Sequence, residues 1–594
     1  MLCRLFGLSP FERALVVLCA GVELDASFAG LCGAAQRDSA RPYPTFSLAL
    51  AALPDPHWSA VTPAGALRRW RLIELLQQGT LPVTASPLRI DERILHFLTG
   101  VQHLDDRLAG LIASAQASGD LVPSHQILAQ QLADVWRQAQ DRPPLIELCG
   151  ADEPTRRSVA AAGCALLNLH LSALSAEQIP GSAVELEAFV RLWEREAALT
   201  SSALYVDSET IDASDGRALA AVSRLLERTN GAVVLSGRDR WRALRRPALT
   251  FDIHKPTRAE QQTLWQGLLG DTANLNGQAH RLASQFNLHV PAIRASVRDA
   301  LTDSVNGTTI GQRLWDAGRA QARPRLESLA QRIEPSAAWD DLVLPDAEKR
   351  ALHAIADQVA HRATVYDAWG FGKLGARGLG ISALFCGSSG TGKTMAAEVM
   401  AGALRLDLYR IDLAGVVSKY IGETEKNLRR VFEAAEDGGA ILFFDEADAL
   451  FGKRTEVKDS HDRYANIEIN YLLQRMETYR GLAILATNRK GDLDSAFLRR
   501  IRFVVNFPFP DAAQRAEIWR RVFPASAPTE GLDWEKLSSL NLAGGNIRNI
   551  AVQAAFLAAA AGDTVHMRHL AQAASTEFAK LEKPLANAAL GGWK

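Results

Sequence analysis

The sequence has few cysteines, and they are not arranged in pairs. It contains six cysteines in 594 residues, and none of them forms a C-x-x-C pair with another. This spacing excludes a zinc ribbon and a scaffold of closely spaced disulfides. Since most of these cysteines stand in apolar segments, we expect buried free thiols and a reducing compartment.

Long apolar runs and a signal-peptide pattern are also missing. No apolar stretch has the length of about 20 residues that a membrane-spanning helix needs. Residues 1–10 lack the basic-then-apolar order of a secretory signal peptide. We therefore expect a cytoplasmic protein that has no membrane partner.

The sequence has almost no net charge. Its 66 Lys and Arg residues are balanced by 67 Asp and Glu residues, which leaves a formal charge of −1. A neutral chain has no overall attraction for DNA, RNA or anionic lipid, so the composition disfavours a nucleic-acid partner. The local alternative is Arg68, Arg69 and Arg71 around Trp70, which could face a phosphate backbone but fit a docking or packing surface better.

The length requires several domains. With 47% hydrophobic and 22% charged residues, the chain has the composition of a globular protein, but it is too long for a single core. Residues 1–140 contain short helical segments, such as the apolar segment 11–20, and brief extended pieces. This pattern predicts a helical or winged-helix-like module at the N-terminus.

A glycine-rich loop organises the C-terminal half. Residues 381–386 predict a buried parallel strand, and residues 395–400 predict a helix. Between them stand the residues of a P-loop, namely Gly387, Ser388, Ser389, Gly390, Thr391, Gly392, Lys393 and Thr394. Such glycines let the backbone approach phosphates, and the loop amides with the helix N-terminus supply a positive field. We expect ATP as the ligand, with Lys393 on its β- and γ-phosphates and Thr394 on Mg²⁺.

Two carboxylates follow another apolar segment, residues 441–444. Adjacent residues of a strand point to opposite faces, so Asp445 and Glu446 can take different roles. We expect Asp445 to orient the Mg²⁺ shell and Glu446 to activate the water that attacks the γ-phosphate. Asn488 closes the next predicted strand, where its amide can position that water or sense the γ-phosphate. A turn asparagine is the structural alternative.

Two adjacent arginines, Arg499 and Arg500, follow an apolar helical segment. Both can reach a γ-phosphate as arginine fingers. If they act on the site of a neighbouring subunit, head-to-tail contacts must close into a ring. The sequence does not decide which of the two is the finger, and Arg502 fits a solvated basic face.

Tyr420, Ile421 and Gly422 form an aromatic and aliphatic tip that is flanked by charged residues. An exposed tip of this kind should contact something, and in a ring it would line the axial channel and grip a polypeptide. The alternative is a tyrosine packed on its own module. The charged segment 452–463 could line the same channel.

The order of elements around the P-loop occurs twice. In each half of the chain, three predicted strands are followed by a proline, a helix and a tryptophan. The strands are residues 145–149, 203–207 and 231–236 in the first copy, and 381–386, 440–445 and 482–487 in the second. We interpret this pattern as an internal duplication of one P-loop module.

The first copy lacks the residues that bind phosphate and catalyse hydrolysis in a P-loop module. Counting from Gly150 places Thr155 and Arg156 at the positions of the last loop glycine and the lysine, and Ser208 at the position of the catalytic acid. We therefore expect a non-hydrolysing structural module. The alternative is an Arg156 that still contacts a phosphate.

The second copy resembles the AAA+ ATPases of the katanin- and spastin-like group over residues 339–580. The resemblance rests on the P-loop, the two acids, the polar amide, the arginine pair and the aromatic tip. It implies adenine contacts near Asp341 and Leu342, and a helical lid that begins with the Gly-Gly-Asn segment around Gly545. The sequence departs from the group at Ser388 and its neighbour, where two prolines are usual, and in the absence of a Pro-Gly spacer between the arginines.

The whole chain resembles bacterial tandem AAA+ proteins with a degenerate first module, many of which accompany extracellular contractile injection systems. This resemblance implies a role in remodelling the particle or in loading its cargo. It also implies that the protein acts as a homo-oligomeric ring, a hexamer, on a protein substrate that is an injection-system component or its cargo.

Together these inferences predict an α/β fold: a P-loop NTPase (AAA+) parallel sheet with a C-terminal helical lid, duplicated, after a mostly helical or winged-helix-like module. The expected divisions are an N-terminal module (1–140), a degenerate module (141–320), a linker (321–338), an active core (339–510) and a lid with a tail (511–594). The expected function is that of an ATP-hydrolysing protein-remodelling motor. A nucleotide-dependent scaffold or switch is the alternative, and a DNA-directed motor is the third hypothesis.

Overall fold

The computed structural model describes most of the chain. The described residues are 1–76, 81–115, 119, 121–212, 215–241, 244–270, 276–302, 308–323, 330–374, 380–413, 423–449, 470–488 and 498–582. The chain forms two compact units, of which unit 1 contains Met1–Glu260 and His289–Pro291, and unit 2 contains Gln261–Leu288 and Ala292–Lys594. Within the described ranges, no helix is both long and apolar enough to cross a membrane.

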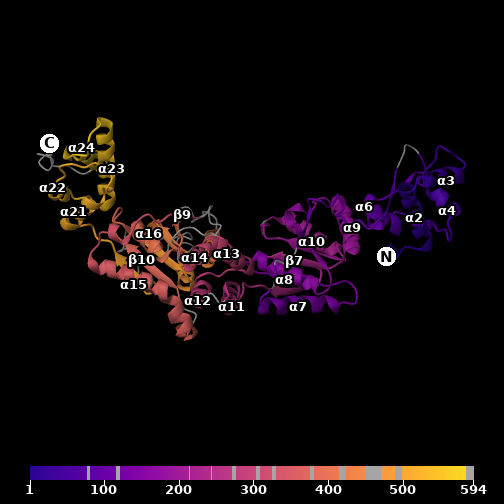
Figure 1. The fold of residues 1–594 in the computed structure, drawn as a ribbon, viewed down its shortest axis with the longest axis horizontal. Helices are drawn as coiled ribbons and strands as arrows, with labels where there is room; N and C mark the ends of the chain where they lie inside the picture. Colours follow the sequence, from indigo (N-terminus) through magenta and orange to yellow (C-terminus); the bar gives the residue numbers. More distant parts are fainter. Residues whose placement is uncertain are drawn as a thin grey trace, which may run out of the picture. The chain divides into compact units, whose positions relative to one another are not determined.

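Unit 1 begins with a mostly helical module (Figure 1). Its elements are α1 (Leu2–Phe6), α2 (Pro10–Leu24), α3 (Ser27–Ala35), α4 (Phe46–Ala52), α5 (Ala66–Arg69), β1 (Ile73–Leu75), β2 (Leu88–Ile90) and α6 (Glu92–Leu98). Strands β1 and β2 pair antiparallel. Helix α2 starts at a capping box, because the Glu12 N–H donates to Ser9 Oγ (3.1 Å) and the Ser9 N–H donates to Glu12 Oε2 (2.9 Å). Phe11 and Phe46 are fully buried in its core.

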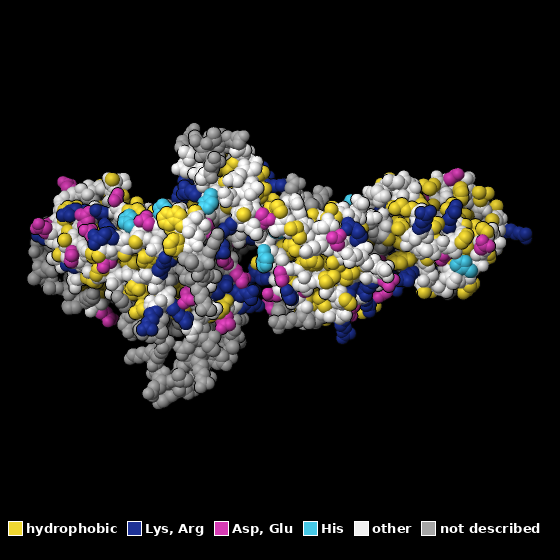
Figure 2. Space-filling model, turned by 90° about the horizontal axis from the view of Figure 1, so that it is seen from below, with side chains coloured by type: hydrophobic (Ala, Val, Ile, Leu, Met, Phe, Trp, Pro, Cys, Tyr) yellow, Lys and Arg dark blue, Asp and Glu magenta, His cyan; other side chains and the backbone are white. Residues whose placement is uncertain are grey.

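The basic cluster around Trp70 is tied into this module. The Trp70 ring packs against Phe6, with 5.5 Å between the ring centroids. Arg68 Nη1 donates to the Val61 carbonyl (3.0 Å), and the Arg69 guanidinium lies 5.0 Å from the Trp70 ring centroid. On the face of the molecule in Figure 2, positive and negative side chains are interspersed rather than separated by sign. These contacts favour packing over a phosphate-binding surface.

The first six-stranded sheet has the strand order β3-β5-β6-β7-β4-β8. Its strands are β3 (Ile112–Ala115), β4 (Leu145–Cys149), β5 (His170–Ser175), β6 (Ser202–Asp207), β7 (Val233–Gly237) and β8 (Ala248–Asp252). All neighbours pair in parallel except β3, which is antiparallel to β5. Helices α7 (Pro123–Arg137) and α8 (Glu153–Ala165) contribute to the core on one face, and α9 (Ala183–Thr200) and α10 (Gly216–Arg228) to the core on the other.

Buried charges join the N-terminal module to α9. The Arg93 and Glu196 side chains are 2.8 Å apart, and each is only 2% exposed. Arg195, which is fully buried, forms an ion pair with Asp105, and Arg107 pairs with the same carboxylate at 2.8 Å. Burial raises the pKa of Asp105, but hydrogen bonds from Arg107 and the charges of Arg195 and Arg107 outweigh it, so this pKa lies below its ordinary value.

The second sheet repeats the first, strand for strand. Its order is β14-β10-β13-β12-β11-β9. The strands are β9 (Gln331–Ile333), β10 (Ile381–Cys386), β11 (Leu408–Asp412), β12 (Ile441–Asp445), β13 (Leu482–Thr487) and β14 (Phe503–Asn506). The terminal strand β9 is antiparallel to β11, as β3 is to β5, and all other neighbours are parallel. The predicted duplication of an α/β module is therefore confirmed.

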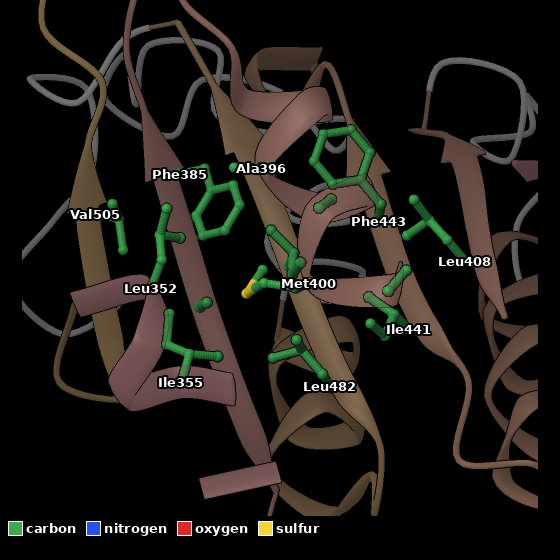
Figure 3. Close-up of a cluster of buried hydrophobic side chains, with 14 of the residues drawn as sticks. Leu352, Ile355, Phe385, Ala396, Met400, Leu408, Ile441, Phe443, Leu482 and Val505 are labelled. Carbon is green, nitrogen blue, oxygen red and sulfur yellow. The ribbon is translucent and has the colours of Figure 1, made fainter. Parts of the chain in front are cut away.

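The core of unit 2 lies on both faces of this sheet. Helices α15 (Asp346–Arg362) and α16 (Lys393–Leu404) cover one face, where Leu352, Ile355 and Met400 point at the strand residues Phe385 and Phe443 (Figure 3). Helix α18 (Glu423–Glu436) packs against the other face through Leu428, Val431 and Phe432. Because both faces are buried, the central strands appear in the sequence as continuous apolar runs.

Unit 2 also contains helices that precede the second module. They include α12 (Asn276–Gln285) and α14 (Ile310–Gln321), whereas α11 (Arg258–Leu269) and α13 (Val290–Thr302) cross the division between the units. Trp315 Nε1 donates to the Arg405 carbonyl (3.0 Å), Arg323 pairs with Asp407 (3.3 Å), and Gln285 Nε2 donates to the Gly438 carbonyl (3.1 Å). Helices α12 and α14 therefore belong to the compact unit of the second sheet, although they follow the first sheet in the sequence.

The chain continues into a helical lid. It consists of α21 (Ala512–Arg521), α22 (Trp534–Ser538), α23 (Gly544–Ala561) and α24 (Met567–Lys580). Fully buried Trp519 belongs to its core, and Trp519 Nε1 donates to the Leu537 carbonyl (3.1 Å). The expected lid helix around Gly545 is thus the first turn of α23.

Candidate nucleotide-binding site

The P-loop connects β10 to α16, and its glycines stand where the backbone leaves no room for a side chain or adopts a left-handed conformation. A Cβ atom on Gly387 would lie 2.3 Å from the Phe507 carbonyl oxygen, so only glycine fits there. Gly392, which caps α16, has a φ of 102°, a conformation that side-chain-bearing residues rarely adopt. The glycine spacing seen in the sequence is therefore required by a close backbone approach and by a left-handed turn.

Lys393 is the first residue of α16, and its ammonium group lies inside the loop. Lys393 Nζ donates to the carbonyls of Gly387 (2.6 Å) and Ser388 (3.1 Å) and to Asn488 Oδ1 (2.9 Å). Burial lowers the pKa of Lys393, and the nearby charge of Asp445 only partly opposes this effect. The structure thus brings the lysine, the loop and the sensor candidate Asn488 into direct contact.

Asp445 ends β12 and holds a cation. Its Oδ2 accepts from Arg410 Nε (3.0 Å) and lies 2.7 Å from Arg410 Nη2. Thr394 follows Lys393 in the first turn of α16, and its hydroxyl has no hydrogen-bond partner among the described residues. Carboxylate and hydroxyl oxygens are ligands that suit Mg²⁺, and the guanidinium on Asp445 shows that this carboxylate attracts positive charge. The residues present therefore fit a magnesium ion.

Glu446 has a left-handed backbone with φ 52°, which is uncommon for a residue other than glycine. Its N–H donates to Oδ1 of the preceding Asp445 (3.0 Å), and its side chain is exposed. Strained backbone of this kind is concentrated at functional sites. The conformation places Glu446 directly beyond the strand end, next to the candidate metal ligand.

Asp448 is a site residue that the sequence analysis missed. Its carboxylate accepts from the Thr487 hydroxyl and, at 3.2 Å, from the Asn488 N–H. The available signal was a third acid in the run Asp445, Glu446, Ala447, Asp448. Asp448 therefore fixes the end of β13, from which Asn488 reaches Lys393.

The two arginine-finger candidates differ in their contacts. Arg500 Nε lies 3.7 Å from Glu477 Oε1, a distance and exposure that make a weak ion pair. Arg499 is exposed and has no ion-pair partner in the described part of the chain. Arg502 is exposed, as expected for a solvated basic residue; its Nη1 donates to the Tyr366 hydroxyl (2.6 Å) and its N–H donates to Ser382 Oγ (3.1 Å).

The two residues expected near adenine lie in the turn η3 (Trp339–Asp341) and just after it. Asp341 Oδ2 accepts from the Ala338 N–H (2.8 Å), so this carboxylate stabilises its own turn. Leu342 is 2% exposed, and its Cδ1 would lie 3.8 Å from a Cβ on Gly392. The buried Leu342 side chain thus packs near Gly392 of the P-loop.

The lid touches the P-loop through its first turn. The Gly545 N–H donates to the Gly390 carbonyl (2.9 Å), and a Cβ on Gly545 would approach Gly390 Cα to 3.1 Å. Gly545 therefore lies at the loop. Tyr420, Ile421 and Gly422, and the charged segment 452–463, lie outside the described residues, and their channel role stays a prediction.

The corresponding position in unit 1 is filled by the chain itself. Helix α8 begins at Glu153, three residues after Gly150, whereas α16 begins six residues after Gly387, so Arg156, which counting places at the lysine position, lies within α8 rather than at its start. Arg156 Nη1 nevertheless donates to the Gly150 carbonyl, as Lys393 does to that of Gly387. Its guanidinium also donates to Ser236 Oγ (2.7 Å) and to Glu209 Oε2 (2.6 Å). The Arg156 side chain is fully buried.

Three parts of the chain match known families. Residues 383–510 match the ATPase family associated with various cellular activities (AAA), and residues 257–324 match the contractile injection system ATPase helical domain. Residues 1–112 match the winged helix domain, variant, which confirms the expected N-terminal module. The helical-domain match coincides with helices α11–α14, two of which, α12 and α14, pack in unit 2.

Curated relatives are similar to part of the chain. An uncharacterized AAA family ATPase of Sinorhizobium fredii is 36% identical over 187 residues, 31% of this chain and 53% of the relative. The 26S proteasome subunit RPT4 of Saccharomyces cerevisiae is 35% identical over 184 residues, 30% of this chain and 42% of the relative. A proteasome-activating nucleotidase of Saccharolobus islandicus is 32% identical over 200 residues, 32% of this chain and 51% of the relative.

The match thus spans about half the length of these relatives. The P-loop, β12, β13 and the arginine pair all fall within residues 383–510. The chain therefore carries an AAA ATPase domain, joined to a winged helix domain and to the helical domain of contractile injection system ATPases.

Proposed function

We propose that this chain is an ATP-hydrolysing protein-remodelling motor. The observation that carries the proposal is the contact of Lys393 with both the P-loop and Asn488, at a loop that the lid touches through Gly545. The AAA ATPase domain supports nucleotide hydrolysis. Because Arg156 fills the corresponding position in unit 1, all turnover runs through Lys393.

Each residue of the site has one task in this mechanism. The loop amides and Lys393 bind the phosphates of ATP, and Thr394 and Asp445 would hold Mg²⁺, which neutralises phosphate charge. Glu446 takes the proton of the attacking water, and Asn488 orients that water. Asp448 is a positioning residue, because it holds Asn488 through the backbone N–H.

The site is completed by a neighbouring copy in a ring, for which we propose six subunits. Arg499 and Arg500 are exposed at the end of the segment before β14, where they can reach a nucleotide bound to another subunit. Neither is committed to a strong ion pair within the described residues. Tyr420, Ile421 and Gly422 line the channel of this ring and grip a polypeptide.

The partner is a protein of a bacterial contractile injection system, either a component of the particle or its cargo. The match of residues 257–324 to the helical domain of such ATPases supports this assignment. The name of the proteasome-activating relative supports a polypeptide substrate by analogy. The six free cysteines of this chain suit a reducing compartment, so we place the motor in the cytoplasm.

A nucleotide-dependent scaffold or switch is the second candidate. It would need ATP binding without turnover, but the acid after β12 and the arginine pair before β14 are both present. A DNA-directed motor has weaker support, because the chain is nearly neutral and the cluster around Trp70 is used in packing.

Replacing Glu446 by glutamine tests the proposal. We expect Glu446→Gln to bind a fluorescent ATP analogue as tightly as the wild type, while turnover falls by about 100-fold or more because no base takes the proton. Lys393→Ala should lose binding, and Glu433→Gln on α18 is the matched surface control. Electron microscopy of Glu446→Gln with ATP should show a ring with a polypeptide in its channel. Unchanged turnover, or a monomer, would overturn the motor.

A further inference from the structure

The carboxylate of Asp445 is fully engaged within the chain. Arg410 contacts Oδ2 with its Nε at 3.0 Å and with its Nη2 at 2.7 Å, and Oδ1 accepts from the Glu446 N–H at 3.0 Å. Asp445 is 19% exposed and Arg410 is 44% exposed. A cation of the protein therefore contacts the carboxylate that the proposed function assigns to a metal ion.

The strand register explains how Arg410 reaches this position. Strands β11 and β12 run in parallel, with Arg410 opposite Phe443 and Asp412 opposite Asp445. Residues two apart on a strand share a face, so Arg410 lies on the face of Asp445, one step back from the strand end. Its long side chain runs along the strand to the edge where the carboxylate lies.

The same register brings two carboxylates close together, and a nearby positive charge reduces their repulsion. Asp412 and Asp445 are directly opposite on neighbouring strands, and like charges in this arrangement repel each other. Lys393 is near enough for the Asp445 charge to affect its pKa. Asp445 thus has one cation of the chain in direct contact, on the adjacent strand.

We propose that Arg410 is a positioning residue that competes with the divalent cation for Asp445. Without metal, the guanidinium holds the carboxylate at the strand end. When a metal ion and nucleotide bind together, the guanidinium leaves Oδ2 and turns into the solvent to which it is already partly exposed. Tight nucleotide binding therefore needs a higher free metal concentration than it would without the Arg410 guanidinium. This inference rests on the proposed nucleotide site.

The test is a titration of Mg²⁺ against the full chain with a fluorescent ADP analogue, which needs no hydrolysis. In Arg410→Gln, the Mg²⁺ concentration for half-maximal tightening of binding should fall about two- to five-fold, the range that a part-exposed ion pair is worth. Affinity in EDTA should stay that of the wild type. Arg410→Lys, which keeps the charge, should remain close to the wild type.

Arg429→Gln is the matched control. Arg429 and Glu433 on α18 also form a 2.7 Å pair, with exposures of 51% and 22% that resemble those of Arg410 and Asp445. This variant should leave the Mg²⁺ midpoint unchanged. If Arg410→Gln does not fold, as judged by thermal unfolding without ligand, Arg410→Met takes its place in the titration. This variant keeps the aliphatic stem of the side chain and lacks its charge.

Two results would overturn the inference. An unchanged Mg²⁺ midpoint in Arg410→Gln would mean that the pair does not compete with metal, and weaker binding in EDTA would mean that Arg410 contacts a phosphate. A wild type that binds no nucleotide would contradict the proposed function itself. A wild type that binds, with a variant midpoint that does not move, would contradict this inference alone.

Discussion

A single side chain, Asp448, joins the parts of the candidate site. It accepts hydrogen bonds from the Thr487 hydroxyl and from the Asn488 N–H, and Asn488 Oδ1 accepts from Lys393 Nζ. Asp448 therefore holds the backbone of Asn488, whose side chain in turn contacts the lysine of the P-loop. Loss of Asp448 should misplace Asn488 without removing the phosphate ligands.

We expect Asp448→Ala to lower kcat by about 10- to 100-fold, as is typical when an outer-shell partner is removed. KM for ATP should change much less, because the P-loop itself stays intact. Asp448→Asn keeps one acceptor oxygen and should lose less activity. Steady-state hydrolysis over a range of ATP concentrations separates the two constants. A rise in KM at unchanged kcat would instead assign Asp448 to nucleotide binding.

At the residue scale, the sequence predicts what depends on local spacing and misses what depends on register. The P-loop, Asp445 and Glu446 follow strands whose apolar runs are visible in the sequence. Arg410 is a lone arginine in its strand, and only the pairing of β11 with β12 brings it to Asp445. The direction of a buried guanidinium such as that of Arg156 is likewise set by packing partners that lie far away in the chain.

At the scale of elements, the shorter loop of unit 1 decides the fate of its site. Because α8 starts three residues after Gly150, there is no six-residue cradle for phosphates, and Arg156 extends from the helix to the Gly150 carbonyl. Its charge is balanced by Glu209, and Tyr205 and Arg156 both donate to Ser236 Oγ. A cation with these partners takes the position at which a nucleotide's charge would be neutralised.

We predict that the chain binds one nucleotide, and that Lys393→Ala binds none. Arg156→Ala should not gain a site, but should lower the free energy of unfolding of unit 1 by about 1–3 kcal/mol, less than a fully buried pair because Glu209 is one-third exposed. Equilibrium binding of a fluorescent nucleotide gives the stoichiometry, and thermal unfolding gives the stability. Nucleotide retained by Lys393→Ala would contradict this account.

The elements themselves were predictable to different degrees. The central strands of both sheets are buried on two faces, so their apolar runs were visible, and the same order of elements in each half indicated the duplication. Strand β9 has only three residues, Gln331–Ile333, with no apolar pattern, so the sequence predicts a linker for its segment. It becomes a strand because the edge of β11 is there to pair with it.

At the scale of the whole molecule, the sequence repeat and the compact units divide the chain differently. Helices α12 and α14 follow the first sheet in sequence, yet they pack in unit 2 through Trp315, Arg323 and Gln285. Asp407 is central to this packing, because Arg319, Arg323 and Arg332 all lie within 3.9 Å of its carboxylate. Contacts between residues far apart in sequence cannot be derived from local patterns.

We expect two unfolding transitions in the full chain, only one of which a bound nucleotide stabilises. Asp407→Ala should lower the free energy of the nucleotide-sensitive transition by about 1–3 kcal/mol, because the charged contacts of three arginines with this carboxylate are lost. Glu196→Ala is the matched control in unit 1, where breaking the buried pair with Arg93 should lower the other transition by about 3–5 kcal/mol. Calorimetry with and without nucleotide assigns them. The division fails if both variants act on the same transition.

The contacts of buried Arg156 with Gly150, Ser236 and Glu209 have a consequence for how the protein responds to the cellular ATP level. A nucleotide site empties as the cellular ATP level falls, but a guanidinium that is part of the chain cannot be diluted, exchanged or hydrolysed. The conformation of unit 1 should therefore be the same in a starved cell as in a growing one. Only the site at Lys393 would respond to the ratio of ATP to ADP. One protein would therefore combine a module whose conformation is independent of the nucleotide concentration with a module whose conformation depends on it.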